Sequence, residues 1–446
     1  MQKIIVKIPR QIFDQANADL GRPHPYAAER VGFFSTRCTV TKDIRLVHCV
    51  SYHPIDDRDY LRDQDVGACI GSKAITDAMA RSVNDSVGQL HVHCHGDRRI
   101  PRPSGVDRRG LPPVARSLRN ANAKEVHGWV ILGQTDAWAS LLLPGVKICL
   151  DEAICTIIGF PTVRNRPAPV PRLPTDVLSK ENRYHRQSFL GADSDHIIAR
   201  IKVAVIGLGG GGSHIVQQLA HLGFRNFVLF DDDRITGTNL NRLIGGTLDD
   251  VQNKTLKIEI AARVILSLHR KPAIEKYATK WEENREALLD CDLVFGCVDQ
   301  LIPRRELEAF CRRNLIPYID VGMDIEKTKS AHEIYGQVIL SMPGYSCMQC
   351  SGFLDAGKLA EEAAKYGDAG SNPQVVWSNG MICSAAVGLA VDLITDWSKT
   401  SRNTHFLNMV GSRGTLTPDR RLETLTTLTC SHYPLAQSGD PILRPL

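Results

Sequence analysis

The sequence predicts an α/β protein with two domains, of which the second contains a doubly wound, Rossmann-like sheet. Three observations lead to this fold class. Short apolar strands alternate with helical patterns in the second half of the chain, a glycine-rich turn joins the first of these strands to a helix, and a proline-rich stretch separates the two halves. The length of 446 residues is also typical of two or three domains.

Composition narrows the class of protein. The chain carries 54 Lys and Arg against 49 Asp and Glu, so its net charge of +5 is too dilute to predict binding to nucleic acid. The N-terminal residues lack a signal-peptide pattern, and no run reaches the roughly 18 uncharged apolar residues of a membrane span. We therefore expect a cytoplasmic protein with no membrane contact, in which most of the 13 cysteines are reduced, buried thiols.

The proline-rich stretch at residues 161–176 disfavours both a helix and a central strand and is interpreted as a linker. Residues 1–160 contain strand-like runs such as "LVHCVSYH" and "QLHVHCH" and one predicted helix, "SKAITDAMARSVND", which indicate a small α/β domain. Residues 177–446 contain the predicted strands "KVAVIGL", "FVLFD", "LVFGCVD" and "PYIDVG", separated by helical patterns such as "LKIEIAARVIL" and "RRELEAFCRRN". This alternation predicts a mostly parallel sheet.

A glycine-rich turn follows the strand "VAVI". Gly207, Gly209, Gly210 and Gly212 precede a helix that we expect to begin near Ser213. Backbone N–H groups at the start of a helix point toward a bound phosphate, and glycine lets the phosphate approach closely. Such a turn can also serve only to make a tight connection between strand and helix. Other residues are therefore needed to predict whether it binds a phosphate.

The segment after the second strand distinguishes ATP from NAD as the ligand. Asp231 is placed to bind a ribose hydroxyl, which both nucleotides carry. Asn239, Arg242 and, on the next predicted helix, Lys257 add polar and cationic side chains beyond the ribose. A triphosphate attacked at its α-phosphorus needs cations on its β- and γ-phosphates, whereas a redox dinucleotide does not. The pattern therefore predicts ATP.

Asp299 stands just after the apolar strand "LVFGCV", at the edge where ligands of open α/β sheets bind. A carboxylate there can hold Mg²⁺ against the phosphates. The alternative is an acid that only caps the end of the strand.

Together these residues resemble the ThiF/MoeB/HesA superfamily, the adenylating domain of ubiquitin-activating enzymes. The resemblance covers residues 180 to about 400 and rests on the glycine turn, the D-x-D pair Asp231 and Asp233, an N-L-x-R motif, a lysine and a C-x-D motif. The resemblance implies that Asp231 binds the ribose and that Asp299 binds magnesium. It also implies three phosphate ligands, which are Asn239, Arg242 and Lys257.

The family likeness extends to the preceding segment "NRYHRQSFLG". It implies that Arg186 reaches the ATP of the partner subunit in a homodimer. Two positions depart from the family pattern. Leu243 stands where glutamine is usual, and Lys257 comes two residues later than in compact members, so Lys254 remains an alternative for the lysine.

Cys347 and Cys350 have the C-x-x-C spacing by which one turn supplies two thiolates to tetrahedral zinc. Many members of the family complete the site with a second C-x-x-C motif, whereas this chain offers Cys430 and His432 near its end. We predict a zinc site with three cysteines and one histidine, and the alternative is a set of reduced core thiols.

In relatives that form a thioester or persulfide, a cysteine lies in the loop before the last helix. The matching residues 351–380 contain none, and Cys383 falls in a run that predicts a buried helix. Core packing is the expected role of Cys383. The acyl adenylate is then expected to pass directly to an outside nucleophile, or to a more distant cysteine.

The first domain contains "HVHCHGDRRIPRPSGVD", in which alternating histidines share one side of a strand. His93, His95 and Asp107 can converge on a zinc ion whose fourth position holds water, with Glu29 as the general base for that water. The pattern resembles the JAB/JAMM metalloproteases, which cut after the C-terminal glycine of ubiquitin-like proteins.

Two features depart from the JAB/JAMM pattern. The spacer before Ser104 is one residue longer than usual, and glycine replaces the proline that commonly follows. Choosing His91 and His93 as the two metal-binding histidines, in place of His93 and His95, fits the JAB/JAMM pattern less well. A degenerate, non-catalytic scaffold and polar residues on a partly exposed strand are the remaining interpretations.

These expectations combine into one function. We expect ATP-dependent adenylation of the C-terminal glycine of a ubiquitin-like protein in a conjugation pathway, with ATP, Mg²⁺ and Zn²⁺ as cofactors. The attached JAB-like domain would process the same carrier. The expected partners are the carrier, a conjugating enzyme and a second copy of this chain. The alternatives are activation of a sulfur carrier of the molybdopterin or thiamine type, and a non-catalytic binding scaffold.

Overall fold

The computed structural model describes residues 2–23, 27–62, 67–96, 101–165, 183–191, 193–329, 331–364, 374–395, 397–398, 405–425 and 430–439. The chain divides into two compact units. The first consists of residues 1–173, 313–315 and 434–442, and the second of residues 174–312, 316–433 and 443–446. Most of the expected linker, residues 166–176, lies outside the described part of the chain.

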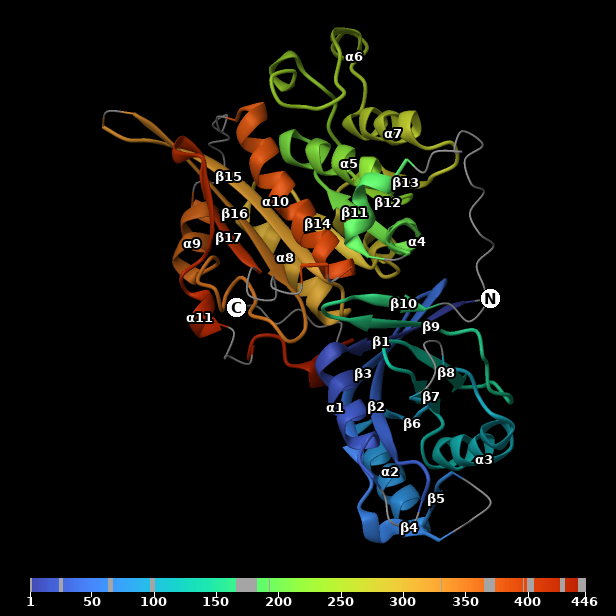
Figure 1. The fold of residues 1–446 in the computed structure, drawn as a ribbon. Helices are drawn as coiled ribbons and strands as arrows, with labels where there is room; N and C mark the ends of the chain where they lie inside the picture. The colour runs from blue at the N-terminus through green and yellow to red at the C-terminus, as the bar shows by residue number, and fades with distance from the viewer. Residues whose placement is uncertain are drawn as a thin grey trace. The chain divides into compact units, whose positions relative to one another are not determined.

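The first unit contains an eight-stranded mixed sheet with the strand order β10-β9-β1-β3-β2-β6-β7-β8 (Figure 1). Apolar residues of α1 pack on one face of this sheet, and those of α2 and α3 pack on the other. The predicted helix over residues 72–85 is present as α2. The helices are α1 (Arg10–Leu20), α2 (Ser72–Asp85) and α3 (Gly105–Ala121), and the strands are β1 (Lys3–Pro9), β2 (Val31–Val40), β3 (Ile44–Pro54), β4 (Tyr60–Leu61), β5 (Cys69–Ile70), β6 (Gly88–Cys94), β7 (His127–Leu132), β8 (Ala137–Leu142), β9 (Ile154–Ile158) and β10 (Val163–Asn165).

The second unit contains an eight-stranded sheet with the order β13-β12-β11-β14-β15-β16-β17-β18. The strands from β13 to β15 are parallel, as the alternation of strands and helices predicts. The strands are β11 (Lys202–Ile206), β12 (Asn226–Phe230), β13 (Ala273–Tyr277), β14 (Leu293–Gly296), β15 (Tyr318–Lys327), β16 (His332–Ser341), β17 (Phe406–Val410) and β18 (Thr415–Pro418), and the helices are α4 (Ser194–Arg200), α5 (Gly210–Leu222), α6 (Leu248–Gln252), α7 (Lys257–Leu268), α8 (Leu301–Arg313), α9 (Ala356–Ala364), α10 (Val376–Thr395) and α11 (Leu422–Leu425).

The doubly wound α/β class is therefore confirmed for the second unit. Its antiparallel edge was not expected from the sequence. A short turn joins β15 to β16, and a connection this short allows only an antiparallel pair. Strands β17 and β18 continue the antiparallel pairing.

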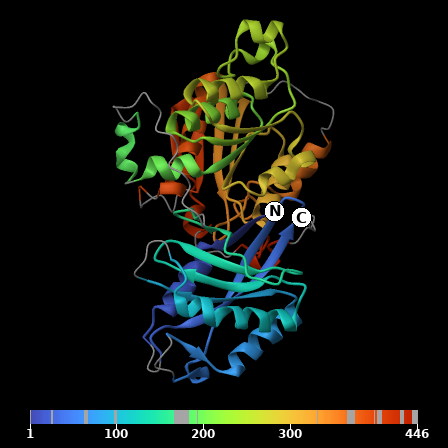
Figure 2. The ribbon, with the colours of Figure 1, turned by 90° about the vertical axis from the view of Figure 1, so that its right-hand side faces the viewer.

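Helices cover both faces of the second sheet (Figures 1 and 2). Helix α5 packs against α7 and α10, and α10 also packs against β15 and β16. On the opposite face, apolar residues of α8 and α9 join the core formed by β11, β12 and β14. The central strands are buried on both sides, which explains why their sequences are continuous apolar runs.

Helix α10 is the one helix in the described part of the chain that is long and apolar enough to cross a membrane by length and composition. Within the structure, 67% of that stretch is buried. A core helix meets the same criteria, and α10 packs between α5 and β15.

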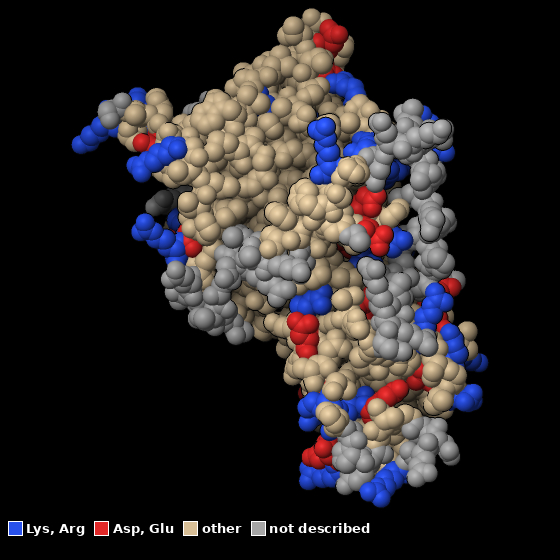
Figure 3. Space-filling model, viewed as in Figure 1, with Lys and Arg blue, Asp and Glu red and all other residues tan. Residues whose placement is uncertain are grey.

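Charged side chains are interspersed on the face drawn in Figure 3. Basic and acidic residues alternate there, and a broad uncharged area covers part of the second unit. This distribution agrees with the small net charge of +5.

Candidate functional site

A cavity of about 720 Å³ lies at the carboxyl ends of β11, β12 and β14 in the second unit. Strand β11 lies between β12 and β14, so the chain leaves it in opposite directions and a crevice forms where the order reverses. The structure brings most of the expected nucleotide residues into its lining. These are Gly207, Gly209, Gly210, Asp231, Asp233, Asn239, Arg242, Lys257 and Asp299.

The glycine turn starts its helix earlier than expected. Helix α5 begins at Gly210 with Gly209 as its N-cap, so the predicted start near Ser213 is wrong. The physical reason is that glycine can adopt helical dihedrals, and the Ser213 N–H closes the first turn on the Gly209 carbonyl at 3.1 Å. The backbone N–H groups at the helix start therefore belong to the glycines themselves.

Two glycines of the turn have different structural roles. Gly207 has a φ of +84°, and a Cβ there would lie 2.6 Å from the Cys297 carbonyl oxygen, so the position requires glycine. At Gly212 a Cβ would lie 1.9 Å from the Gly207 carbonyl oxygen. Among the described residues, Gly212 is not part of the cavity lining, so it serves the close approach of α5 to β11.

Asp231 is fixed by the backbone around it. The Leu208 N–H donates to its Oδ2 at 2.6 Å and the Asp233 N–H donates to its Oδ1 at 2.9 Å. Burial raises the pKa of Asp231 above its ordinary value, and the nearby Lys257 opposes this shift. The carboxylate is thus held at the end of β12, next to the glycine turn, where it can accept hydrogen bonds from a ribose.

Two cations reach the cavity from different elements. Arg242 follows the short helix Gly237–Asn239, and its Nη1 donates to the Thr238 carbonyl at 2.7 Å. Lys257 is the first residue of α7, and its Nζ donates to Asp233 Oδ2 at 2.6 Å. Of the described residues, Lys254 is not in the cavity lining. The structure therefore places Lys257, and not Lys254, at the cavity.

Asn239 and Leu243 frame the arginine. Asn239 Oδ1 accepts hydrogen bonds from the backbone N–H and the hydroxyl of Thr236 at 2.9 and 3.1 Å. Its amide nitrogen is the atom that remains to serve a ligand. Leu243 is buried against Ile235 and Ile260. The departure from the family pattern at Leu243 thus lies in a small apolar core and not in the cavity lining.

Asp299 is exposed, follows β14 and lines the cavity. It can hold a hard cation against phosphates bound at the glycine turn. Arg186, in contrast, is exposed on the short helix His185–Leu190 and is not among the described residues that line the cavity of its own chain.

The sequence analysis missed a segment at the other end of the cavity. Thr279, Lys280, Trp281 and Glu282 follow β13 and line the cavity beside Asp231. Strand β13 is parallel to β12, so its carboxyl end lies at the same edge. The rule that ligands bind at the carboxyl ends of strands could have found this segment, but the two charges in "AIEKY" hide its strand character.

Arg304 of α8 was also missed, and it brings a further buried cation to the cavity. Its Nη1 lies 3.6 Å from Asp320 Oδ2, and its Nε donates to the Val298 carbonyl at 2.7 Å. The Tyr318 hydroxyl donates a hydrogen bond to Asp320 Oδ1 at 2.8 Å, and burial raises the pKa of Asp320. These contacts fix the guanidinium next to the segment that carries Asp299.

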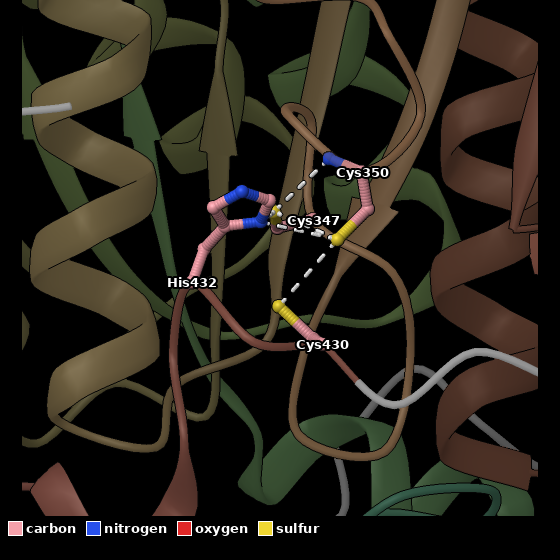
Figure 4. Close-up of side chains that lie close together, drawn as sticks. All are labelled: Cys347, Cys350, Cys430 and His432. Atoms are coloured by element: carbon pink, nitrogen blue, oxygen red, sulfur yellow. Dashed lines mark hydrogen bonds between the residues drawn. The ribbon is translucent and has the colours of Figure 1, made fainter.

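Three sulfur atoms and one imidazole nitrogen converge elsewhere in the second unit (Figure 4). Cys350 Sγ lies 3.5 Å from Cys347 Sγ and 3.8 Å from Cys430 Sγ, and His432 Nδ1 lies 3.4 and 3.2 Å from Cys347 Sγ and Cys350 Sγ. A tetrahedral ion with bonds of about 2.0–2.3 Å separates its ligand atoms by about 3.3–3.8 Å. The hydrogen bond from Cys347 lowers the pKa of Cys430 and raises the pKa of Cys347, so without a metal the two sulfur atoms share one proton. The cluster could hold a metal ion.

Cys383 is fully buried in α10, as expected from the sequence. Its Sγ donates to the Gly211 carbonyl at 3.3 Å, and burial raises its pKa to about 12. A thiol with so high a pKa is a poor nucleophile, so packing is the role that the structure supports.

A second cluster lies in the first unit, where ligand atoms of Glu29, His93 and His95 come within 4.8 Å of one another. His93 is buried on β6, and its Nε2 lies 3.2 Å from Asp107 Oδ1. His95 follows the strand, and its Nε2 lies 3.6 Å from Asp107 Oδ2. All four residues expected from the sequence are thus close together.

The surroundings of this cluster fix two of its members. The Nδ1 of His95 lies 3.0 Å from the Arg102 carbonyl, to which it can only donate, so in the neutral imidazole Nε2 carries the lone pair. Ser104 caps α3 and forms a capping box with Asp107. His91 is also buried, with its ring centroid 5.7 Å from that of His93.

Comparison with known proteins agrees with the geometry of the second unit. The model of the ThiF family matches residues 182–427. The sulfur carrier protein ThiS adenylyltransferase of Escherichia coli K12 is 30% identical over 177 residues, which cover 38% of this chain and 66% of that protein. Ubiquitin-like modifier-activating enzyme 5 of Drosophila ananassae is 28% identical over 164 residues, covering 33% of this chain and 39% of that protein.

A third relative acts on a different kind of molecule, according to its name. The tRNA threonylcarbamoyladenosine dehydratase of Escherichia coli K12 is 29% identical over 135 residues, covering 30% of this chain and 50% of that protein. The aligned region therefore spans less than two thirds of the length of each of these relatives.

Proposed function

This chain belongs to the ThiF family, and we propose that it is an adenylyltransferase that activates the C-terminal glycine of a ubiquitin-like protein with ATP. The observation that carries the proposal is the cavity itself. It combines a glycine turn and the Asp231 carboxylate with the cations of Arg242 and Lys257 and with the carboxylate of Asp299. A redox dinucleotide has no β- and γ-phosphates of a triphosphate for these cations to bind, whereas in ATP each cation can neutralise phosphate charge.

The reaction asks little covalent chemistry of the protein. A carboxylate oxygen of the carrier attacks the α-phosphorus, the bond to the bridging oxygen breaks, and pyrophosphate leaves behind an acyl adenylate. Arg242 and Lys257 neutralise charge on the departing phosphates. Asp299 would hold Mg²⁺, which would supply further charge neutralisation there. The geometry of the cavity lining thus serves mainly to orient the two reactants.

The direct test is exchange of labelled pyrophosphate into ATP in the presence of candidate carriers that end in glycine. Carrier-dependent exchange, together with tighter binding of ATP than of NAD, is the expected result. Tighter binding of NAD would overturn the proposal. Activation of a sulfur carrier of the molybdopterin or thiamine type is the second candidate function. It is favoured by the ThiS adenylyltransferase of Escherichia coli, which is named for a sulfur carrier. A non-catalytic scaffold would show neither binding nor exchange.

The partners follow from the same proposal. Arg186 is absent from the described lining of its own cavity, so the proposal assigns it to the cavity of a second copy in a homodimer. Cys383, the cysteine of α10, is buried and poorly suited to a thioester, so the adenylate passes to an outside nucleophile such as a conjugating enzyme. The cytosol, which supplies ATP and keeps thiols reduced, is the proposed compartment.

The cluster of Cys347, Cys350, Cys430 and His432 is proposed to bind zinc. Sulfur and imidazole ligands at tetrahedral spacing suit this metal, and four protein ligands leave no position for water. A closed site of this kind stabilises the fold and takes no part in the reaction. It ties residues near 350 to residues near 430, which are far apart in the chain.

The first unit is proposed to act as a zinc peptidase on the same carrier. The observation that favours this second function is the contact of His95 Nδ1 with the Arg102 carbonyl, which in the neutral imidazole leaves the Nε2 lone pair available beside Asp107. The three side chains offer three ligands, and Glu29 lies close enough to serve a water in the fourth position. A peptidase that trims a carrier supports a conjugation pathway over sulfur transfer.

A further inference from the structure

Asn379 brings an unpartnered amide to the nucleotide cavity. It stands in the first turn of α10, is 4% exposed and is part of the cavity lining. Its Nδ2 is buried and has no hydrogen-bond partner among the described residues. Buried polar groups in proteins are nearly always hydrogen-bonded, so an amide left open at a cavity points to a ligand that completes it.

The amide lies against the start of α5. A Cβ built on Gly210 would lie 2.5 Å from Asn379 Nδ2, and 3.1 Å from both Arg242 Cδ and Gln374 Oε1. The missing side chain of Gly210 therefore leaves a small space in which these polar residues meet. Helix α5 has 13 residues, and the N–H groups of its first turn attract negative charge into the same space.

The position of this space along the cavity indicates which group of a bound nucleotide the Asn379 amide would contact. The glycine turn is tied to Asp231, the proposed ribose ligand, through the Leu208 N–H. Arg242, proposed for the leaving phosphates, borders the space at Gly210. In a nucleoside triphosphate the α-phosphate is the group between the ribose and the leaving phosphates. The amide of Asn379 is thus placed near the reacting phosphorus.

We propose that Asn379 Nδ2 donates a hydrogen bond to an anionic oxygen at the reaction centre, an inference that rests on the adenylation proposed above. The oxygen belongs either to the α-phosphate or to the carboxylate that attacks it. Both carry negative charge that is redistributed as the new O–P bond forms and the bond to the leaving pyrophosphate breaks. A buried donor that needs no reorganisation stabilises that charge, and no proton is transferred.

The test uses the full chain and ligands of known structure. ATP carries the α-phosphate but no acyl group. The analogue 5′-O-(glycylsulfamoyl)adenosine carries a sulfamoyl group in place of the α-phosphate and also has the acyl oxygen. Calorimetry gives the dissociation constant of each for the wild type, Asn379→Ala and Asn379→Asp. Asn408→Ala is the matched control, because the Asn408 Nδ2 donates to Asp419 Oδ2 at 2.6 Å and Asn408 is outside the described cavity lining. Thermal unfolding checks that each variant is folded.

Asn379→Ala is expected to weaken binding about tenfold or more, since hydrogen bonds to charged groups are the stronger ones. Asn379→Asp should weaken it further, because a carboxylate repels the anionic oxygen. Loss for both ligands assigns the contact to the phosphate oxygen, and loss for the acyl analogue alone assigns it to the acyl oxygen. Asn408→Ala should stay within about twofold of the wild type.

Folded Asn379→Ala that binds both ligands within about twofold of the wild type would overturn the inference, as would Asn379→Asp that binds them more tightly. The failure of the proposed function is a separate result. In that case the wild type binds ATP but catalyses no pyrophosphate exchange with any carrier, while the effect of Asn379→Ala on the affinity for ATP is still measured.

Discussion

Lys257 and Asp233 are joined twice. The Lys257 Nζ donates to Asp233 Oδ2 at 2.6 Å, and the Lys257 backbone N–H donates to the Asp233 carbonyl at 3.0 Å. The lysine side chain is 10% exposed and that of the aspartate 66%. The pair therefore ties the start of α7 to the loop after β12 and holds a largely buried ammonium at the cavity in advance of nucleotide binding.

This arrangement predicts that Lys257 is the lysine that serves the triphosphate. Lys257→Met keeps most of the buried apolar stem and removes the charge, so carrier-dependent pyrophosphate exchange should fall by about two orders of magnitude. Lys254→Met is the matched control, because Lys254 is exposed and outside the described cavity lining. It should exchange within about twofold of the wild type, and the reverse order of effects would assign the role to Lys254.

Asp299 is predicted to be a magnesium ligand. Asp299→Asn removes one charge and little volume, so it should raise the Mg²⁺ concentration needed for half-maximal exchange by about tenfold or more while leaving the melting temperature unchanged. Asp249→Asn, an exposed carboxylate on α6, is the control for lost surface charge. A magnesium dependence equal to that of the wild type would move the metal to another carboxylate.

The sequence was sufficient for the residues whose chemistry is visible in a short motif. The glycines, Asp231 and Asp299 stand next to apolar strands, so the rule for the carboxyl ends of strands is enough to place them together. Lys257 was also predicted, but Lys254 remained an alternative, because it lies only three residues away in the sequence and periodicity alone does not separate the two.

Other parts of the cavity are products of packing and leave no motif. Asn379 belongs to a helix whose sequence indicates a core element, and its amide meets Gly210 only because α10 packs against α5. Arg304 of α8 is held by Asp320, a residue of strand β15. Contacts between distant elements of this kind leave no periodic signal in a single sequence.

Arg186 is predicted to act in the partner subunit. Arg186→Ala and Asp299→Ala should each be nearly inactive alone, because each lacks one member of the composite site. In mixed dimers, one of the two cavities combines an intact Asp299 with the Arg186 of the other subunit, so exchange should recover in part. Mass spectrometry of intact dimers must show that subunits exchange. No recovery in a population of mixed dimers would assign Arg186 to its own cavity or to no cavity.

The four-ligand cluster near Cys347 is predicted to be a structural zinc site. Cys350→Ser should lower the zinc content by about one atom per chain and lower the melting temperature, because the metal connects distant segments. Cys149→Ser is the control, since Cys149 is a partly buried free thiol of the first unit that belongs to neither cluster. Unchanged zinc content in Cys350→Ser would leave these residues as core thiols.

The cluster of the first unit can be tested separately in the Cys350→Ser background, where any remaining zinc reports on it alone. His95→Ala should remove this zinc, because His95 offers Nε2 beside Asp107. His91→Ala should keep it, because His91 is outside the cluster. Glu29→Gln should also keep the zinc, yet it should abolish cleavage of a carrier extended beyond its C-terminal glycine, since the amide cannot accept a proton from the attacking water. Retention of zinc without cleavage in the wild type would make the first unit a metal-stabilised scaffold, and absence of zinc would mean that the contacts of Asp107 with His93 and His95 hold α3 against the end of β6 without a metal.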